Sequence, residues 1–257
     1  MMDPCEELNE KLIQKKYNVR LKDVVKTFTK RLFYYIFDEH DNELQSLKKT
    51  FLDITDNLNI ENNEAVWEEF KSEFPAIRVK LDLDAVAVVN FDPATKSLEE
   101  VYMACPGFYA ISIYRLSHQL YVQKVPILPR MMSEYVHGIT GIDIHPGATI
   151  GESFFVDHGT GIVIGETSII KNNVKIFQGV TLGGIQVKKQ LESTKRHPTI
   201  EDNVTIYANA TILGGDIVIG ANSTIGANVW ITQSVPENSL VTYQTEIKIR
   251  PKKNGIR

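Results

Sequence analysis

The chain has 257 residues, of which 43% are hydrophobic and 23% are charged, and its formal net charge is -4 at pH 7. It is long enough for one large core or two smaller ones, and its mild acidity argues against nucleic acid or an anionic membrane as a partner.

The start of the chain and its cysteines bear on the compartment. The first residues read MMDPCEELNEK, so acids stand where a signal peptide needs a basic and then an apolar run. No stretch of about 18 apolar residues occurs that would predict a membrane span. Cys5 and Cys105 form no CxxC or Cys/His spacing, which favours free thiols in a reducing compartment. We therefore expect a cytoplasmic protein.

The first part of the chain is predicted to be helical. From Glu6 to Arg78 apolar residues recur at helical spacing without a glycine, and one helix is expected in VRLKDVVKTFTKRLFYYIFDEH with Asn18 as its cap. Further helices are expected over 107–123 and from 129, the latter ending at Gly138. In the transition at 79–106, before these helices, Asp92 precedes a proline, which favours a turn or a helix start.

From residue 143 the pattern changes to an aliphatic residue every six positions, with one step of eight and, later, one of seven. Such a period fits neither a helix nor an alternating strand, but it is typical of a hexapeptide-repeat parallel β-helix. Three hexads close one coil, the aliphatic residues stack inward, and glycine or asparagine turns the corners. The repeat positions are Ile144, Ile150, Val156, Ile164, Ile170, Ile176, Leu182, Ile200, Ile206, Ile212, Ile219, Ile225 and Ile231.

Polar residues inside the repeat are the candidates for chemistry. Asp143 and His158 are 15 residues apart, close to one coil, and neighbouring coils stack at about 4.8 Å, so the two side chains are expected to meet. A carboxylate that orients an imidazole makes a general base for a substrate alcohol. Turn formation is the alternative role for Asp143. Structural roles are expected for His118, His137 and His145.

The hexads are interrupted by IQVKKQLESTK, residues 185–195, which is followed at once by Arg196 and His197. This predicts a protruding loop over 185–197. A guanidinium fork and an imidazole at its end are suited to hold a carboxylate, while a tolerated surface insertion is the alternative.

The segments DIHPGATIG, DHGTGIVIGET, GVTLGG and KRHPTI, in this order, resemble the bacterial serine acetyltransferases. The resemblance covers about residues 140–236 and extends upstream through VVNFDPA and GFYAISIYRLSHQL. It implies an α+β multidomain fold: an N-terminal all-α helical domain (1–139), a C-terminal left-handed parallel β-helix (140–236) and a tail (237–257).

The resemblance also implies a reaction, the transfer of an acetyl group from acetyl-CoA to the hydroxyl of L-serine for cysteine biosynthesis, without a metal. Its general base would be His158, oriented by Asp143. Asp92 and Asp157 would bind the substrate ammonium, and Arg196 and His197 its carboxylate. Small residues are expected to line the acetyl-CoA groove, namely Gly183, Gly184, Ala208 and Ala227. Tyr207 departs from the family pattern, because a small residue is usual there.

The same resemblance implies a homotrimer with sites between subunits, and a pairing of two trimers through the N-terminal helices. Relatives often dock O-acetylserine sulfhydrylase through a tail ending in Ile. This tail ends Gly-Ile-Arg, so no tight complex of that kind is expected.

Two alternatives remain. A γ-class carbonic anhydrase shares the β-helix but needs three histidines that bind zinc. In this chain the candidate zinc ligands would be His145, His158 and His197. The second alternative is a non-enzymatic β-helix with a structural or regulatory role.

Overall fold

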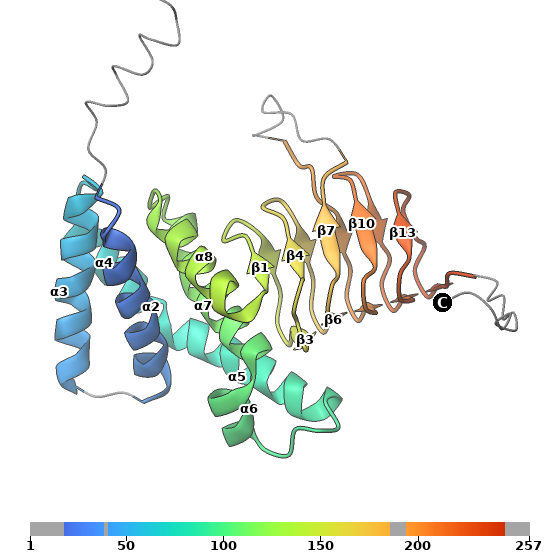
Figure 1. The fold of residues 1–257 in the computed structure, drawn as a ribbon, viewed down its shortest axis with the longest axis horizontal. Helices are drawn as coiled ribbons and strands as arrows, with labels where there is room; N and C mark the ends of the chain where they lie inside the picture. Colours follow the sequence, from blue (N-terminus) through green and yellow to red (C-terminus); the bar gives the residue numbers. More distant parts are fainter. Residues whose placement is uncertain (1–17, 39–40, 186–193, 245–257) are drawn as a thin grey trace, which may run out of the picture.

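The computed structural model describes residues 18–38, 41–185 and 194–244. A group of helices leads into a coil of short parallel strands (Figure 1). The expectations for the first 17 residues, for the excursion at 186–193 and for the tail beyond 244 lie outside the described residues. Within the described part, no helix is long and apolar enough to cross a membrane.

The described helices precede the coil and carry most of the large buried aromatic side chains. Their bounds are α2 Leu21–Phe37, α3 Asp41–Asn57, α4 Asn63–Ser72, α5 Phe74–Phe91, α6 Leu98–Ala104, α7 Pro106–Val122 and α8 Leu128–Thr140.

Two predicted helix ends differ from the structure. Arg20, not Asn18, occupies the N-cap of α2, and no side chain caps this helix. The helix α8 continues through Gly138 and ends at Gly141, whose φ of 71° is the left-handed conformation that terminates helices. Glycine is tolerated at a modest cost inside a helix, and Gly138 therefore does not stop this one.

The coil consists of two- and three-residue strands in three parallel sheets. Sheet A has the order β1-β4-β7-β10-β13, sheet B the order β11-β8-β5-β2, and sheet C the order β14-β12-β9-β6-β3. Together they make a left-handed β-helix of about 5 turns. The bounds are β1 Asp143–Ile144, β2 Thr149–Ile150, β3 Phe155–Asp157, β4 Val163–Ile164, β5 Ile169–Ile170, β6 Lys175–Phe177, β7 Thr181–Gly183, β8 Thr199–Ile200, β9 Thr205–Ile206, β10 Thr211–Leu213, β11 Val218–Ile219, β12 Thr224–Ile225, β13 Trp230–Ile231 and β14 Leu240–Val241. The last strand thus lies beyond the predicted boundary at 236.

The aliphatic column predicted from the six-residue period is confirmed. In sheet A, Ile144 pairs with Ile164, which pairs with Leu182, and the same stacking continues in the other sheets. All thirteen repeat positions are buried. Asparagines with positive φ turn several corners, among them Asn203, Asn209 and Asn228.

The first coil is longer than a regular one. Asp143 pairs with Val163, 20 residues on, whereas Ile164 pairs with Leu182, 18 residues on. The eight-residue step between Val156 and Ile164 accounts for the difference, and it contains His158. This corner is therefore wider than the others.

A buried ion pair joins the helices to the coil. Arg115 of α7 holds the carboxylate of Asp84 of α5 through two hydrogen bonds of 2.6 and 2.8 Å, and it also donates to the carbonyl oxygens of Ile150 and Gly151. Asp84 also accepts a hydrogen bond of 2.9 Å from the backbone amide of Phe154. The first coil is thus fixed against α5 and α7.

Candidate active site

The first group of predicted site residues lies at the corner where sheet C passes into sheet A. Asp92, Asp157 and His158 line a cleft of about 300 Å³ between the end of α5, the start of α7 and strand β3. Cys105 and Gly107 also line this cleft. Asp92, which is distant in the sequence from the adjacent Asp157 and His158, therefore shares one small cavity with them.

His158 stands at the tip of this corner with φ of 55° and a side chain that is 73% exposed. Its Nε2 atom lies 3.7 Å from Oδ1 of Asp157. An imidazole in this position is accessible to a substrate, and a carboxylate lies beside it. Because non-glycine residues rarely adopt positive φ, the backbone of His158 has an uncommon conformation at this wide corner.

Asp92 is the C-cap residue directly after α5. Its two carboxylate oxygens accept hydrogen bonds from the amide of Ala94 and the hydroxyl of Thr95, at 2.8 and 2.7 Å. The bond from Thr95 is the main reason that the pKa of Asp92 lies below its usual value. The carboxylate therefore stays charged and can accept hydrogen bonds from a cation.

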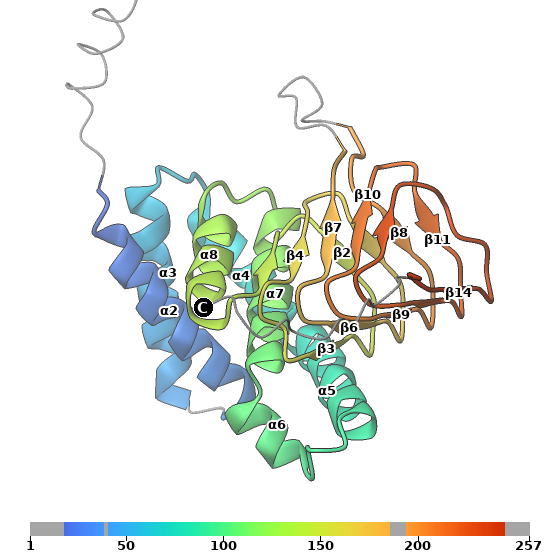
Figure 2. The same cartoon turned by 45° about the vertical axis from the view of Figure 1, so that its right-hand side comes forward.

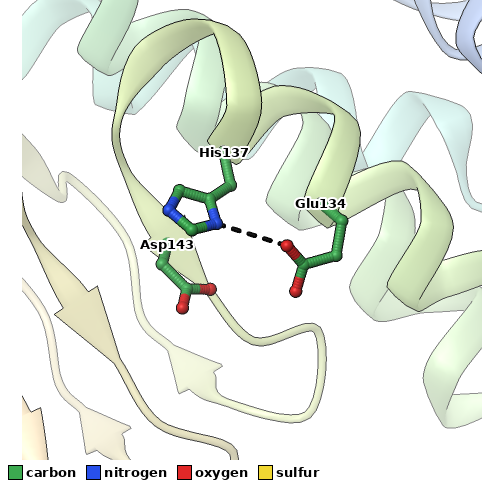
Figure 3. Close-up of side chains that lie close together, drawn as sticks. All are labelled: Glu134, His137 and Asp143. Atoms are coloured by element: carbon green, nitrogen blue, oxygen red, sulfur yellow. Dashed lines mark hydrogen bonds and ion pairs between the residues drawn. The ribbon is translucent and has the colours of Figure 1, made fainter.

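The meeting of Asp143 with His158 that the 15-residue spacing predicts stays a prediction. The side chain of Asp143 projects toward Glu134 and His137 at the end of α8 (Figure 3). Among the described residues, no hydrogen bond or ion pair joins it to His158. In the 20-residue first coil Asp143 pairs with Val163. The orienting role of Asp143 stays a prediction.

The second group of predicted residues lies at the opposite border of sheet A, where the chain passes into sheet B. Arg196 and His197 are separated from β8 by Pro198 alone, and Thr167 holds both of them. The Thr167 hydroxyl accepts from the amides of Arg196 and His197, at 2.9 and 3.1 Å. The ring of His197 packs over Gly165, where a Cβ atom would lie 2.1 Å from it.

His197 has a defined tautomer. The amide of Thr167 donates to its Nδ1 atom at 3.0 Å, so Nδ1 is an acceptor and the ring proton is on Nε2. Burial and then the charge of Arg196 lower the pKa of His197 to about 4. At neutral pH the ring is therefore an uncharged donor through Nε2.

Arg196 is held by a residue that the sequence reasoning missed. Glu166 forms an ion pair with its Nη2 atom and accepts a hydrogen bond of 2.8 Å from Tyr121 of α7. Burial raises the pKa of Glu166, but these two hydrogen bonds and the charges of His145 and Arg196 together lower it below its usual value. The helical domain thus positions the guanidinium through Tyr121 and Glu166. Glu166 is 30 residues before Arg196, and residues 185–195 interrupt the six-residue repeat between them. The spacing in the sequence therefore does not predict this ion pair.

The four residues predicted to bind acetyl-CoA also lie at the two opposite borders of sheet A. Gly183 and Gly184 leave sheet A on the side of Arg196, while Ala208 and Ala227 follow strands of sheet C on the side of His158. Ala208 is half-buried and Ala227 is exposed. Tyr207 stacks on Phe177 with ring centroids 4.8 Å apart, so an aromatic surface adjoins Ala208.

The histidines counted toward zinc do not gather at one corner. His145 accepts a hydrogen bond from the amide of Gly147 within the turn after β1, as expected for a structural residue. It lies on the side of His197, whereas His158 lies at the other border of sheet A. Likewise, Nδ1 of His118 lies 2.7 Å from the carbonyl oxygen of Pro146, a structural contact.

Comparisons with known proteins agree with the fold. The model for the bacterial transferase hexapeptide (six repeats) matches residues 197–233. A curated serine acetyltransferase of Synechococcus elongatus, described as plasmid, is 47% identical over 186 residues, which are 70% of this chain and 58% of that protein. The serine acetyltransferase of Bacillus subtilis is 50% identical over 125 residues, 49% of this chain and 55% of the relative. The chain thus spans little more than half the length of these curated relatives.

Solved structures match over more of their length. Serine acetyltransferase isoform 3 of Entamoeba histolytica, in complex with cysteine, is 36% identical with a TM-score of 0.76, covering 93% of this chain and 86% of that one. The serine acetyltransferase of Neisseria gonorrhoeae, in complex with serine, is 28% identical with a TM-score of 0.65, covering 89% and 98%.

Proposed function

The chain belongs to the serine acetyltransferase family, and we propose that it transfers an acetyl group from acetyl-CoA to the hydroxyl of L-serine. The observation that carries the proposal is the division of charge between the two groups of site residues. One group offers carboxylates and an accessible imidazole, and the other offers a guanidinium and an uncharged imidazole donor. A zwitterionic amino acid needs acceptors at one end and donors at the other.

In this proposal Asp92 and Asp157 bind the ammonium group of serine. Arg196 and the Nε2–H of His197 bind its carboxylate. The charged state of Asp92 and the donor tautomer of His197 support these assignments. L-Cysteine carries the same two end groups, and we propose that it competes for the site, in keeping with the Entamoeba histolytica complex.

The chemical step uses His158 as a general base. Its imidazole takes the proton of the serine hydroxyl as the oxygen attacks the thioester carbonyl carbon. The tetrahedral intermediate collapses with cleavage of the carbon–sulfur bond, and the protonated imidazole returns the proton to the leaving thiolate of CoA. Asp143 is proposed to orient His158. The small residues Gly183, Gly184, Ala208 and Ala227 are proposed to line the acetyl-CoA groove.

The position of the two groups supports an assembly of several copies. The groups lie at opposite borders of sheet A, which Figure 1 shows facing the viewer, and we propose that a second copy completes each site. Placing the His158 corner of each subunit against the Arg196 corner of the next closes a ring of three, with sheet A facing the axis. We therefore propose a homotrimer. A pairing of two trimers, and the absence of a tight sulfhydrylase complex, stay predictions.

The test of the activity is acetyl-CoA consumption with L-serine, compared with L-homoserine and a sugar alcohol. His158→Ala should lower kcat about 10²- to 10⁴-fold, the usual loss of a general base. Arg196→Lys, which loses the bidentate fork, should instead raise KM for serine about ten-fold or more with a smaller effect on kcat. Near-normal turnover in His158→Ala would show that the general base is another group, and no turnover of serine by the wild-type protein would refute the function.

A further inference from the structure

Three side chains where α8 ends and β1 begins offer a set of metal ligands, of which the proposed reaction uses only Asp143. Glu134, His137 and Asp143 each present one donor atom, and these atoms all lie within 4.8 Å of one another. Glu134 and His137 are three residues apart and therefore share a helix face. Gly141 ends the helix in the left-handed conformation, and the chain returns as β1 with Asp143 facing them (Figure 3).

We propose that Glu134, His137 and Asp143 bind a divalent transition-metal ion, with zinc as the representative. Two carboxylates and an imidazole suit zinc, cobalt or nickel better than magnesium or calcium, which prefer all-oxygen sites. Donor atoms around tetrahedral zinc lie about 3.4 Å apart, because each bond is about 2.0–2.2 Å. Glu134 and His137 are 44% and 42% exposed, so small side-chain rotations can close the remaining distance.

The electrostatics around the three residues favour a cation. The carbonyl groups at the C-terminal end of α8 carry partial negative charge, and two carboxylates add to it. Arg130 opposes this, because it forms an ion pair with Oε1 of Glu134, while Oε2 faces Nδ1 of His137 at 3.2 Å. Removal of the Arg130 charge should therefore tighten metal binding.

Metal binding would also affect catalysis, and this part of the inference rests on the proposed function. Asp143 is the carboxylate that we propose to orient His158. A metal ion on Asp143 would hold that carboxylate beside α8 and prevent it from turning to the base, so bound zinc should slow acetyl transfer. The cluster is then an inhibitory metal site rather than a cofactor site.

The binding test uses the full chain after treatment with a chelator, with zinc chloride alone as the titrant in calorimetry. One ion per chain should bind, and His137→Asn should weaken binding at least about ten-fold, since even lost outer-shell partners cost that much. Arg130→Met should bind more tightly. His158→Asn is the matched control, because it removes another exposed histidine and should leave zinc affinity unchanged. Equal affinity in wild type and His137→Asn would overturn the site.

The activity test separates the two parts of the inference. Zinc should inhibit the wild-type protein, and His137→Asn should keep its zinc-free activity and lose this inhibition. Zinc that binds through His137 without slowing turnover would overturn the inhibitory role. If the protein acetylates no serine at all, the proposed function fails, while the calorimetry still decides whether the metal site exists.

Discussion

At the residue scale, His197 shows how a short network defines the chemistry of one side chain. The amide and hydroxyl of Thr167 both lie within hydrogen-bond distance of its Nδ1 atom, which leaves the proton on Nε2. Gly165 provides the space for the ring. A histidine that is uncharged and has one defined donor can bind a carboxylate without a change of protonation near neutral pH.

The lowered pKa of His197 predicts a loss of stability in acid. Its pKa is about 4 in the folded chain against 6.5 for an unperturbed ring. Between these pH values the unfolded chain binds a proton that the folded chain does not. The free energy of unfolding should therefore fall as the pH drops from about 6.5 to about 4, by at most about 1.4 kcal/mol per pH unit for this group.

Urea unfolding at a series of pH values, at one protein concentration, measures this dependence. We expect His197→Gln to flatten part of the slope. The rest should persist, because burial also lowers the pKa values of His118 and His145. An unchanged slope in His197→Gln would mean that the ring already carries its proton in the folded protein at these pH values.

At the scale of elements, α7 connects the helical domain to the site at several points. Gly107 in its first turn lies so close to β3 that an added Cβ atom would be 2.7 Å from the carbonyl oxygen of Val156. Arg115 in its middle holds Asp84, and Tyr121 at its end holds Glu166. The position of this one helix therefore affects both borders of sheet A.

Two glycine substitutions should have opposite effects on stability. Gly107→Ala forces α7 away from β3 beside Asp157, and such overpacking costs about 1–3 kcal/mol. Gly138→Ala in α8 meets nothing within 4 Å and should stabilise by about 0.5–1 kcal/mol, because alanine is the better helix former. Urea unfolding of both variants checks the signs. Destabilisation by Gly138→Ala would contradict the helix through this position.

At the scale of the whole molecule, the proposed trimer makes a prediction about mixed assemblies. His158→Ala and Arg196→Ala should each be nearly inactive alone. Co-expressed in equal amounts, they should form trimers in which some sites combine an intact His158 corner with an intact Arg196 corner from the neighbour. Random mixing restores about a quarter of the wild-type sites.

The measurement is the specific activity of co-purified, differently tagged chains, with the mass of the assembly determined in solution. The two variants purified separately and assayed together without exchange of subunits serve as the control. Mixed trimers that remain inactive would mean that each site lies within one chain.

The sequence predicted the coil well because the pattern is local and repeated. Each buried aliphatic residue needs only the same residue one coil away, so a six-residue period is sufficient to identify the stacking. The sequence also allowed the types of side chain at the site to be predicted, since charged and polar residues interrupt an otherwise aliphatic repeat. The helix ends were less predictable, because Gly138 can either stop a helix or lie inside one.

What the sequence by itself determined is therefore the coil, its aliphatic core and the candidate polar residues, of which Asp92, Asp157 and His158 do share a cleft. Only the tertiary structure decided that Asp143 faces α8, that Glu166 and Tyr121 hold Arg196, and that the two groups occupy opposite borders of sheet A. The physical reason is that these relations depend on a widened corner, an excursion of the chain and the packing of α7 and α8, none of which follows the six-residue period.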